Sequence, residues 1–136
     1  MACPPHRMEI AGTMNHTEND QAHHAPQPAI CLIYSTFPSQ ESAEAAAREM
    51  VAGKLVACAN ILPGMVSFYE WEGVIERGEE VVMLLKTTQD AAPDVIATLA
   101  ALHPYEVPAI ITLPLTGGLP AYLHWVAGAV APAGTP

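Results

Sequence analysis

Hydrophobic and polar positions between residues 29 and 126 alternate between strand-like and helix-like patterns. Residues 29–36 (AICLIYST) form a nearly continuous apolar run, which is typical of a buried central strand. Ser39 is a candidate N-cap, because a serine hydroxyl can accept a hydrogen bond from a free amide of the first helical turn. Apolar residues then recur at helical spacing up to position 51, and Gly53 is expected to close the helix as its C′ residue.

A long extended region follows and predicts a β-hairpin with an unusually long first arm. Residues 55–62 (LVACANIL) have the pattern of a strand, which Pro63 and Gly64 must bend or bulge, since proline cannot donate to a ladder. Residues 66–75 (VSFYEWEGVI) alternate in the period of a strand. We expect the turn at residues 76–79 (ERGE) and an apolar return strand at residues 80–87.

The last third of the chain predicts helix, strand and helix in turn. Residues 90–103 form the second main helix, which ends at Pro104. Residues 107–115 form a final strand, and its two prolines place it at a sheet edge or limit its pairing. Residues 119–126 form a short closing helix. The order β-α-β-β-α-β predicts an α+β, ferredoxin-like sandwich with both main helices on one face of the sheet.

The other face of this sheet would be open, and apolar residues such as Val66, Phe68 and Val74 would line it. A monomer would be poorly soluble with that face exposed, so we expect an oligomer that covers it. The folded domain is expected at residues 29–127. Residues 1–28 are interpreted as a disordered N-terminal extension, and residues 128–136 as a flexible C-terminal tail.

Composition and charge narrow the class of protein. The 136 residues carry 14 acidic and 5 basic side chains, a net charge of −9, and 51% of them are hydrophobic. This apolar content excludes global disorder, and so few basic residues exclude a nucleic-acid-binding surface. No apolar run approaches the roughly 20 residues that cross a bilayer. Three cysteines without a CxxC spacing indicate a reduced, cytoplasmic chain.

Familiar catalytic signatures such as GxGxxG, HExxH and GxSxG are absent from the sequence. The segment richest in chemistry is residues 102–108 (LHPYEVP), which places His103, Tyr105 and Glu106 between two prolines. Rigidly held side chains of these types suit a metal or small-ligand site. A structural role is the alternative, in which His103 caps the preceding helix and Glu106 pairs with Lys86.

Two further features have alternative interpretations. Cys58 lies in an apolar strand, where it is either a small core residue or a thiolate ligand for a soft metal. Glu70 and Glu72 are two residues apart on the long strand and could serve acid–base chemistry or bind a hard cation. Their alternation with Tyr69 and Trp71 favours an intersubunit contact instead.

Five segments combine into a specific pattern: residues 54–64 (KLVACANILPG), 67–73 (SFYEWEG), 85–88 (LKTT), 103–108 (HPYEVP) and 122–125 (YLHW). In this order, and over residues 30 to 126, the chain resembles the CutA (CutA1) family of divalent-cation tolerance proteins. The resemblance implies a tight homotrimer with strands that extend between neighbours. In this architecture the family is similar to the PII signalling proteins, which bind ligands in clefts between subunits.

The resemblance also implies a role in tolerance of divalent cations, copper especially, without an enzymatic reaction. The copper ligands proposed for bacterial members are a cysteine at the end of the first strand and two consecutive histidines before Pro-Tyr. Those positions hold Ser35, Leu102 and His103 here, so only His103 matches the pattern.

We therefore expect a non-enzymatic homotrimer involved in copper or divalent-cation tolerance, with weak binding of Cu²⁺ or another divalent cation. The candidate metal ligands are His103, Glu106 and Cys58. The alternative is a PII-like regulatory module that binds a small anionic ligand between subunits. The candidate cleft residues are Lys86, Tyr105, Trp71 and Glu72.

Overall fold

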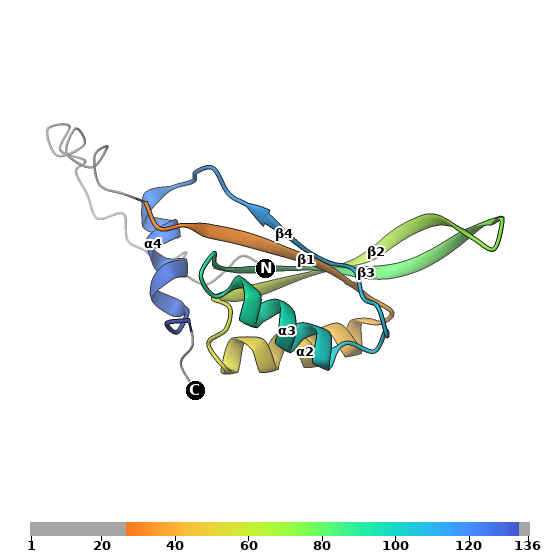
Figure 1. Ribbon diagram of the computed structural model, residues 1–136, viewed down its shortest axis with the longest axis horizontal. Coiled ribbons are helices and arrows are strands. Elements are labelled where there is room, and N and C mark those ends of the chain that lie inside the picture. The colour runs from red at the N-terminus through yellow and green to blue at the C-terminus, as the bar shows by residue number, and fades with distance from the viewer. Residues whose placement is uncertain (1–26, 134–136) are drawn as a thin grey trace, which may run out of the picture.

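A four-stranded antiparallel sheet with two helices packed against one face forms the body of the protein (Figure 1). The structure, a computed structural model, describes residues 27–133. Its elements are β1 (Ile30–Phe37), α2 (Gln40–Ala52), β2 (Cys58–Trp71), β3 (Val74–Thr88), α3 (Ala92–Leu102), β4 (Ile110–Pro114) and α4 (Pro120–Ala129). The strand order β2-β3-β1-β4 confirms the ferredoxin-like arrangement, with β4 at the sheet edge. Residues 1–26 of the expected N-terminal extension lie outside the described residues.

The main core lies between the sheet and the helices α2 and α3. Alternate residues of β1, among them Ile33 and Phe37, are fully buried there, as are Met83 and Leu85 of β3. Burial of these side chains stabilises the fold by about 25 cal/mol for each Å² of apolar surface removed from water. The position of β1 between β3 and β4 confirms the central strand that its apolar run predicts.

Both ends of α2 carry defined caps. Ser39 is the N-cap, and its hydroxyl accepts a hydrogen bond from the Ser42 amide at 3.1 Å. The prediction that Gly53 is the C′ residue is wrong by one position. Gly53 is the C-cap with φ −79°, and the next residue, Lys54, has the positive φ of 57° that is typical of C′. The Leu55 amide donates to the Met50 carbonyl at 3.1 Å, so Lys54 occupies the left-handed position of a Schellman motif.

The long hairpin has its bulge where the sequence predicts it and its turn elsewhere. The register between β2 and β3 shifts between Leu62 and Met65, around Gly64. The turn expected at residues 76–79 is wrong, because Glu72 and Gly73, with φ of 50° and 81°, connect the strands. Two consecutive positive φ values are typical of a type I′ turn, which matches the twist of a hairpin. Residues 76–79 are therefore part of β3.

The outer half of this hairpin projects beyond the other two strands (Figure 1). Apolar side chains on it are exposed to solvent, including Phe68 at 69%, Trp71 at 63% and Ile75 at 74%. The sheet face opposite the helices also carries exposed apolar residues, such as Ile111 and Leu113 of β4. Exposed apolar surface of this extent marks an interaction surface.

The C-terminal helix is longer than its sequence pattern predicts. α4 continues to Ala129, and Val130 after it is buried in the main core. The Ala131 amide donates to the Lys54 carbonyl at 2.9 Å. Residues 128–131, expected in a tail, are thus part of the folded domain, and residues 134–136 lie outside the described residues. Over residues 27–133, every helix is too short or too polar to span a bilayer.

Candidate functional site

His103 lies at the C-terminal end of α3, and both of its ring nitrogens make hydrogen bonds. Nε2 is 2.7 Å from the carbonyl oxygen of Thr36, and Nδ1 accepts from the Tyr105 amide at 3.1 Å. Since Nδ1 accepts, the hydrogen is on Nε2, which donates to Thr36. The buried ring also stacks on Phe37, with centroids 4.2 Å apart. His103 therefore joins α3 to the end of β1, and no lone pair of its ring is left for a metal ion.

The three positions at which the resemblance implies copper ligands do not suit copper in this chain. The Ser35 hydroxyl is completely buried and forms no hydrogen bond with another described residue, whereas a soft metal prefers a thiolate. Leu102 has no donor atom at all. With the ring nitrogens of His103 already bonded, the three positions offer no set of ligands.

The other two candidate metal ligands are not gathered with His103. Glu106 is exposed and makes no ion pair with another described residue. Cys58 is buried, and its sulfur lies 3.8 Å from the hydroxyl of Tyr122, which also accepts from Lys86 Nζ at 3.1 Å. Within residues 27–133, no three His, Cys, Asp or Glu side chains converge as metal ligands would.

A groove of about 600 Å³ lies between the hairpin and the loop that precedes β4. We call it the hairpin groove. It is lined by Tyr69, Trp71, Glu76, Gly78, Glu79, Glu80, Tyr105 and Val107. Of the four expected cleft residues, Trp71 and Tyr105 meet here. Glu72 lies in the hairpin turn, and Lys86 contacts Tyr122 of α4, so neither lines the groove.

Glu80 is held firmly in the hairpin groove. Ser67 Oγ donates to one of its carboxylate oxygens at 3.1 Å, and the Tyr105 hydroxyl donates to the other at 3.2 Å. Burial raises the pKa of Tyr105, and the neighbouring Glu80 and Tyr69 raise it further. The phenol thus stays protonated and able to donate over a wide range of pH.

Sequence reasoning missed the acidic residues of the hairpin groove. The pairing of Tyr69 with Glu76 depends on the turn at Glu72 and Gly73. The sequence analysis expects the turn at residues 76–79, which removes Glu76 from the strand, so it does not predict this pairing. The only signal in the sequence was the acidic run ERGEE at residues 76–80.

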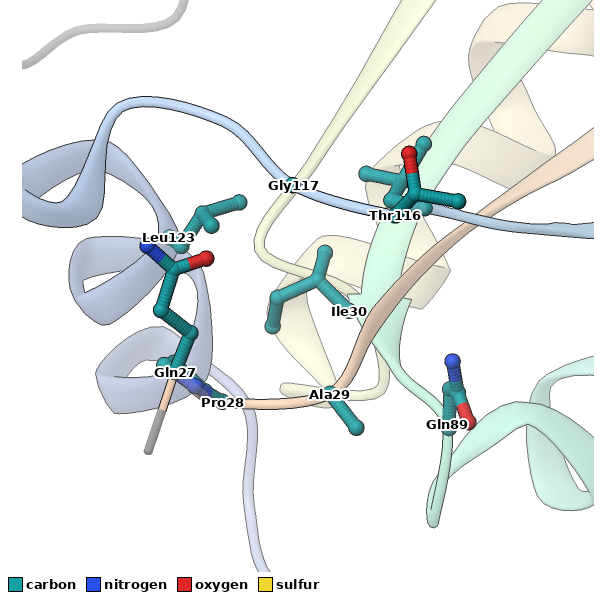
Figure 2. A pocket seen from close by; sticks show the side chains of 9 residues that line it. Gln27, Pro28, Ala29, Ile30, Gln89, Thr116, Gly117 and Leu123 are labelled. Atoms are coloured by element: carbon teal, nitrogen blue, oxygen red, sulfur yellow. The ribbon is translucent and has the colours of Figure 1, made fainter. Parts of the chain in front are cut away.

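A second, smaller cavity of about 160 Å³ lies between the start of β1, the loop after β4 and α4 (Figure 2). Gln27 and Gln89 contribute amide groups to its wall, and Ile30 and Leu123 contribute apolar surface. None of its described lining residues is charged. It therefore has fewer groups for selecting a ligand than the hairpin groove has.

Together, the strand order, the helices on one face and the projecting hairpin define a ferredoxin-like α+β domain. The sequence profile of the family described as "CutA1 divalent ion tolerance protein" matches residues 31–129. The chain belongs to this family.

Relatives and solved structures agree with this assignment. The chain is 41% identical over 95 residues to the divalent-cation tolerance protein CutA of Thermus thermophilus, covering 70% of this chain and 92% of the relative. It is 40% identical over 98 residues to mouse protein CutA, covering 72% of this chain but only 55% of that longer relative. The crystal structure of CutA from Xylella fastidiosa superposes with a TM-score of 0.73 at 41% identity, over 75% of this chain and 98% of that one.

Proposed function

We propose that this chain is the subunit of a non-enzymatic homotrimer that acts in tolerance of divalent metal ions, copper among them. Membership of the CutA1 family and the names of its relatives support the tolerance role. The structural observation that carries the assembly is the projecting hairpin with its exposed apolar side chains.

The hairpin and the open sheet face need cover that one chain does not provide. Val66, Phe68 and Ile75 remain 42%, 69% and 74% exposed. β2 and β4 are the outer strands of the sheet, and an outer strand presents unpaired amides and carbonyls to a neighbour. Pairing of these edges between copies, around a closed symmetry axis, would bury both the polar and the apolar surface.

Light scattering after size-exclusion chromatography tests the assembly. We expect the mass of three copies for the wild type and a lower mass for the double variant Phe68→Ser/Ile75→Ser. Leu119→Ser is the matched control, because Leu119 is 68% exposed but lies outside the hairpin. A wild-type mass of one chain would contradict the proposal.

Metal binding by this chain is proposed to be weak, because its candidate ligands are dispersed and His103 is engaged in hydrogen bonds. Calorimetric titration with Cu²⁺ should give similar weak binding for the wild type and His103→Asn. Cys58→Ser and Glu106→Gln test the two remaining donors in the same way. Tight binding that disappears in His103→Asn would show that copper displaces one of its hydrogen bonds.

Survival of copper-stressed cells tests the tolerance role itself. We expect cells that produce the wild-type chain to survive better than cells that produce Phe68→Ser/Ile75→Ser, with Leu119→Ser again as control. Equal survival with and without the wild-type chain would count against the tolerance role.

The proposed location is the cytoplasm. Cys31 and Cys58 are both free thiols, which suits a reducing compartment.

The alternative of a PII-like module has one observation in its favour, since Trp71 and Tyr105 do share a groove. The charge of that groove disfavours an anionic ligand. Glu76, Glu79 and Glu80 line it, and no lysine or arginine is among its lining residues.

A further inference from the structure

The smaller cavity, at the α4 end of the sheet, has walls from four parts of the chain. They are residues 27–30 at the start of β1, Gln89 after β3, residues 115–117 after β4, and Leu123 of α4 (Figure 2). We call it the α4 cavity. We propose that it binds an uncharged planar ring that carries a carboxamide group. Such a ligand is distinct from the metal ions of the proposed tolerance role.

The base of the α4 cavity is apolar and has room for one ring. Ile30 is 2% exposed and Leu123 is 4% exposed, and they pack with Val126 in a cluster of their own. The cavity has a volume of about 160 Å³. An apolar cavity of about 150 Å³ in another protein holds one benzene molecule, so a six-membered ring fits a volume of this size.

The mouth of the α4 cavity carries amide and hydroxyl groups. Gln27, Gln89 and Thr116 line it and are exposed, so their side chains are open to solvent. In Figure 2, Gln27 and Gln89 lie on opposite sides of Ile30. Within residues 27–133, none of these three side chains hydrogen-bonds to another residue. A glutamine amide has two donors and one acceptor oxygen, and a carboxamide on the ligand presents the matching groups.

The absence of charge around the α4 cavity selects against ions. None of its described lining residues is Asp, Glu, His, Lys or Arg. An ion that leaves water for this cavity would lose hydration without gaining a counterion, which is unfavourable. The net charge of −9 on the chain further disfavours an anion. A neutral ring with a polar group at one end therefore suits the cavity better than a charged ligand of the same shape.

The α4 cavity is remote from the projecting hairpin. α4 and the tip of the hairpin lie at opposite ends of the molecule (Figure 1). The described walls of the cavity all belong to one chain, so the ligand requires no residue from a neighbouring copy. A ligand can therefore bind each subunit independently of the contacts that the hairpin makes.

Three ligands of one shape test whether the site selects a neutral molecule. Benzamide is neutral, benzoate carries a negative charge and benzamidine carries a positive charge. In two-dimensional NMR of the isotope-labelled full chain, benzamide should cause saturable shifts of the Gln89 side-chain amide and of the Thr116 and Gly117 backbone amides. A ligand this small should bind with a Kd on the order of 1 mM. Benzoate and benzamidine should each bind at least about tenfold more weakly, because the cavity has no counterion for either.

Variants at the mouth of the cavity locate the hydrogen bonds. Gln89→Leu and Thr116→Val each remove polar atoms with little change in volume. Each should weaken benzamide binding about fivefold, which corresponds to the loss of one hydrogen bond. Both positions are exposed, so both variants should fold, and circular dichroism verifies this. Gln40→Leu is the matched control, because it makes the same change at an exposed position of α2 outside the cavity, and its affinity should equal that of the wild type.

Four outcomes would overturn the proposal. They are the absence of saturable shifts at the residues of the α4 cavity, equal binding of benzamide and either charged analogue, affinities of Gln89→Leu and Thr116→Val no lower than that of Gln40→Leu, and equal binding of toluene and benzamide. The last result would show that the cavity recognises the ring without the carboxamide.

Discussion

Replacement of His103 by alanine tests whether this residue is structural. The ring is buried, makes two hydrogen bonds and stacks on Phe37. Each hydrogen bond contributes about 1 kcal/mol, and loss of a buried ring of this size adds about 2 kcal/mol. His103→Ala should therefore lower the free energy of unfolding by about 4 kcal/mol.

Two further variants separate the hydrogen bonds. The side-chain oxygen of His103→Asn can replace Nδ1 as acceptor for the Tyr105 amide. The side-chain amide of His103→Gln can replace Nε2 as donor to the Thr36 carbonyl. Each should be more stable than His103→Ala by about 1 kcal/mol. Leu102→Ala, at the adjacent but 37% exposed position, is the control and should lose about 1 kcal/mol.

Urea denaturation followed by circular dichroism, at one fixed subunit concentration, measures these differences. The concentration must be constant because the stability of an assembled chain depends on it. A loss below 1 kcal/mol in His103→Ala, or no difference between His103→Ala and both polar variants, would refute the structural role.

The remaining predictions concern the core, the turn and the hairpin groove. Ser35→Ala should stabilise the fold by about 1 kcal/mol because it removes a buried hydroxyl to which no residue in 27–133 hydrogen-bonds, and a lower urea midpoint would contradict this expectation. Glu72→Asn should stabilise the hairpin by about 0.5 kcal/mol, since asparagine tolerates positive φ better, and thermal denaturation measures the effect. Glu80→Gln should lower the pKa of Tyr105. The titration is measured at 295 nm as the difference in absorbance between a chain with Tyr105 and the same chain with Tyr105→Phe, for the wild type and for Glu80→Gln. Folding raises the pKa of Tyr105, so its stabilising contribution is present below the unfolded pKa of about 10 and is lost as pH rises through the folded value. An unchanged titration of Tyr105 in Glu80→Gln would contradict the role of Glu80 in raising this pKa.

Much of the fold was predictable because local and global preferences agree. The continuous apolar run of β1, the serine cap of α2 and the prolines at positions 108 and 114, before and within β4, each determine a local structure that the tertiary contacts retain. The turn was not predictable in this way. Residues 76–79 resemble a turn because the projecting strand is exposed, so no buried face imposes an apolar pattern on it.

The candidate site depended on features that leave little trace in sequence. Thr36 bonds His103 through its backbone carbonyl, a group that every residue has, so no residue type reveals the bond. Tyr105 and Glu80 are 25 positions apart and meet only because the loop before β4 returns to the hairpin. Trp71 and Tyr105, which the sequence analysis groups as cleft residues, both line the hairpin groove, but a sequence pattern does not show that this groove is acidic.

The unequal strand lengths have a consequence for how the molecule responds to dilution. β2 and β3 have 14 and 15 residues, whereas β1 has 8 and pairs with β3 only from Val81 onward. A two-stranded ribbon is at best marginally ordered in water when nothing packs against it. In the proposed homotrimer, dissociation of the copies should therefore release the outer hairpin while the four-stranded body remains folded, and a protease should then cut first near Glu72.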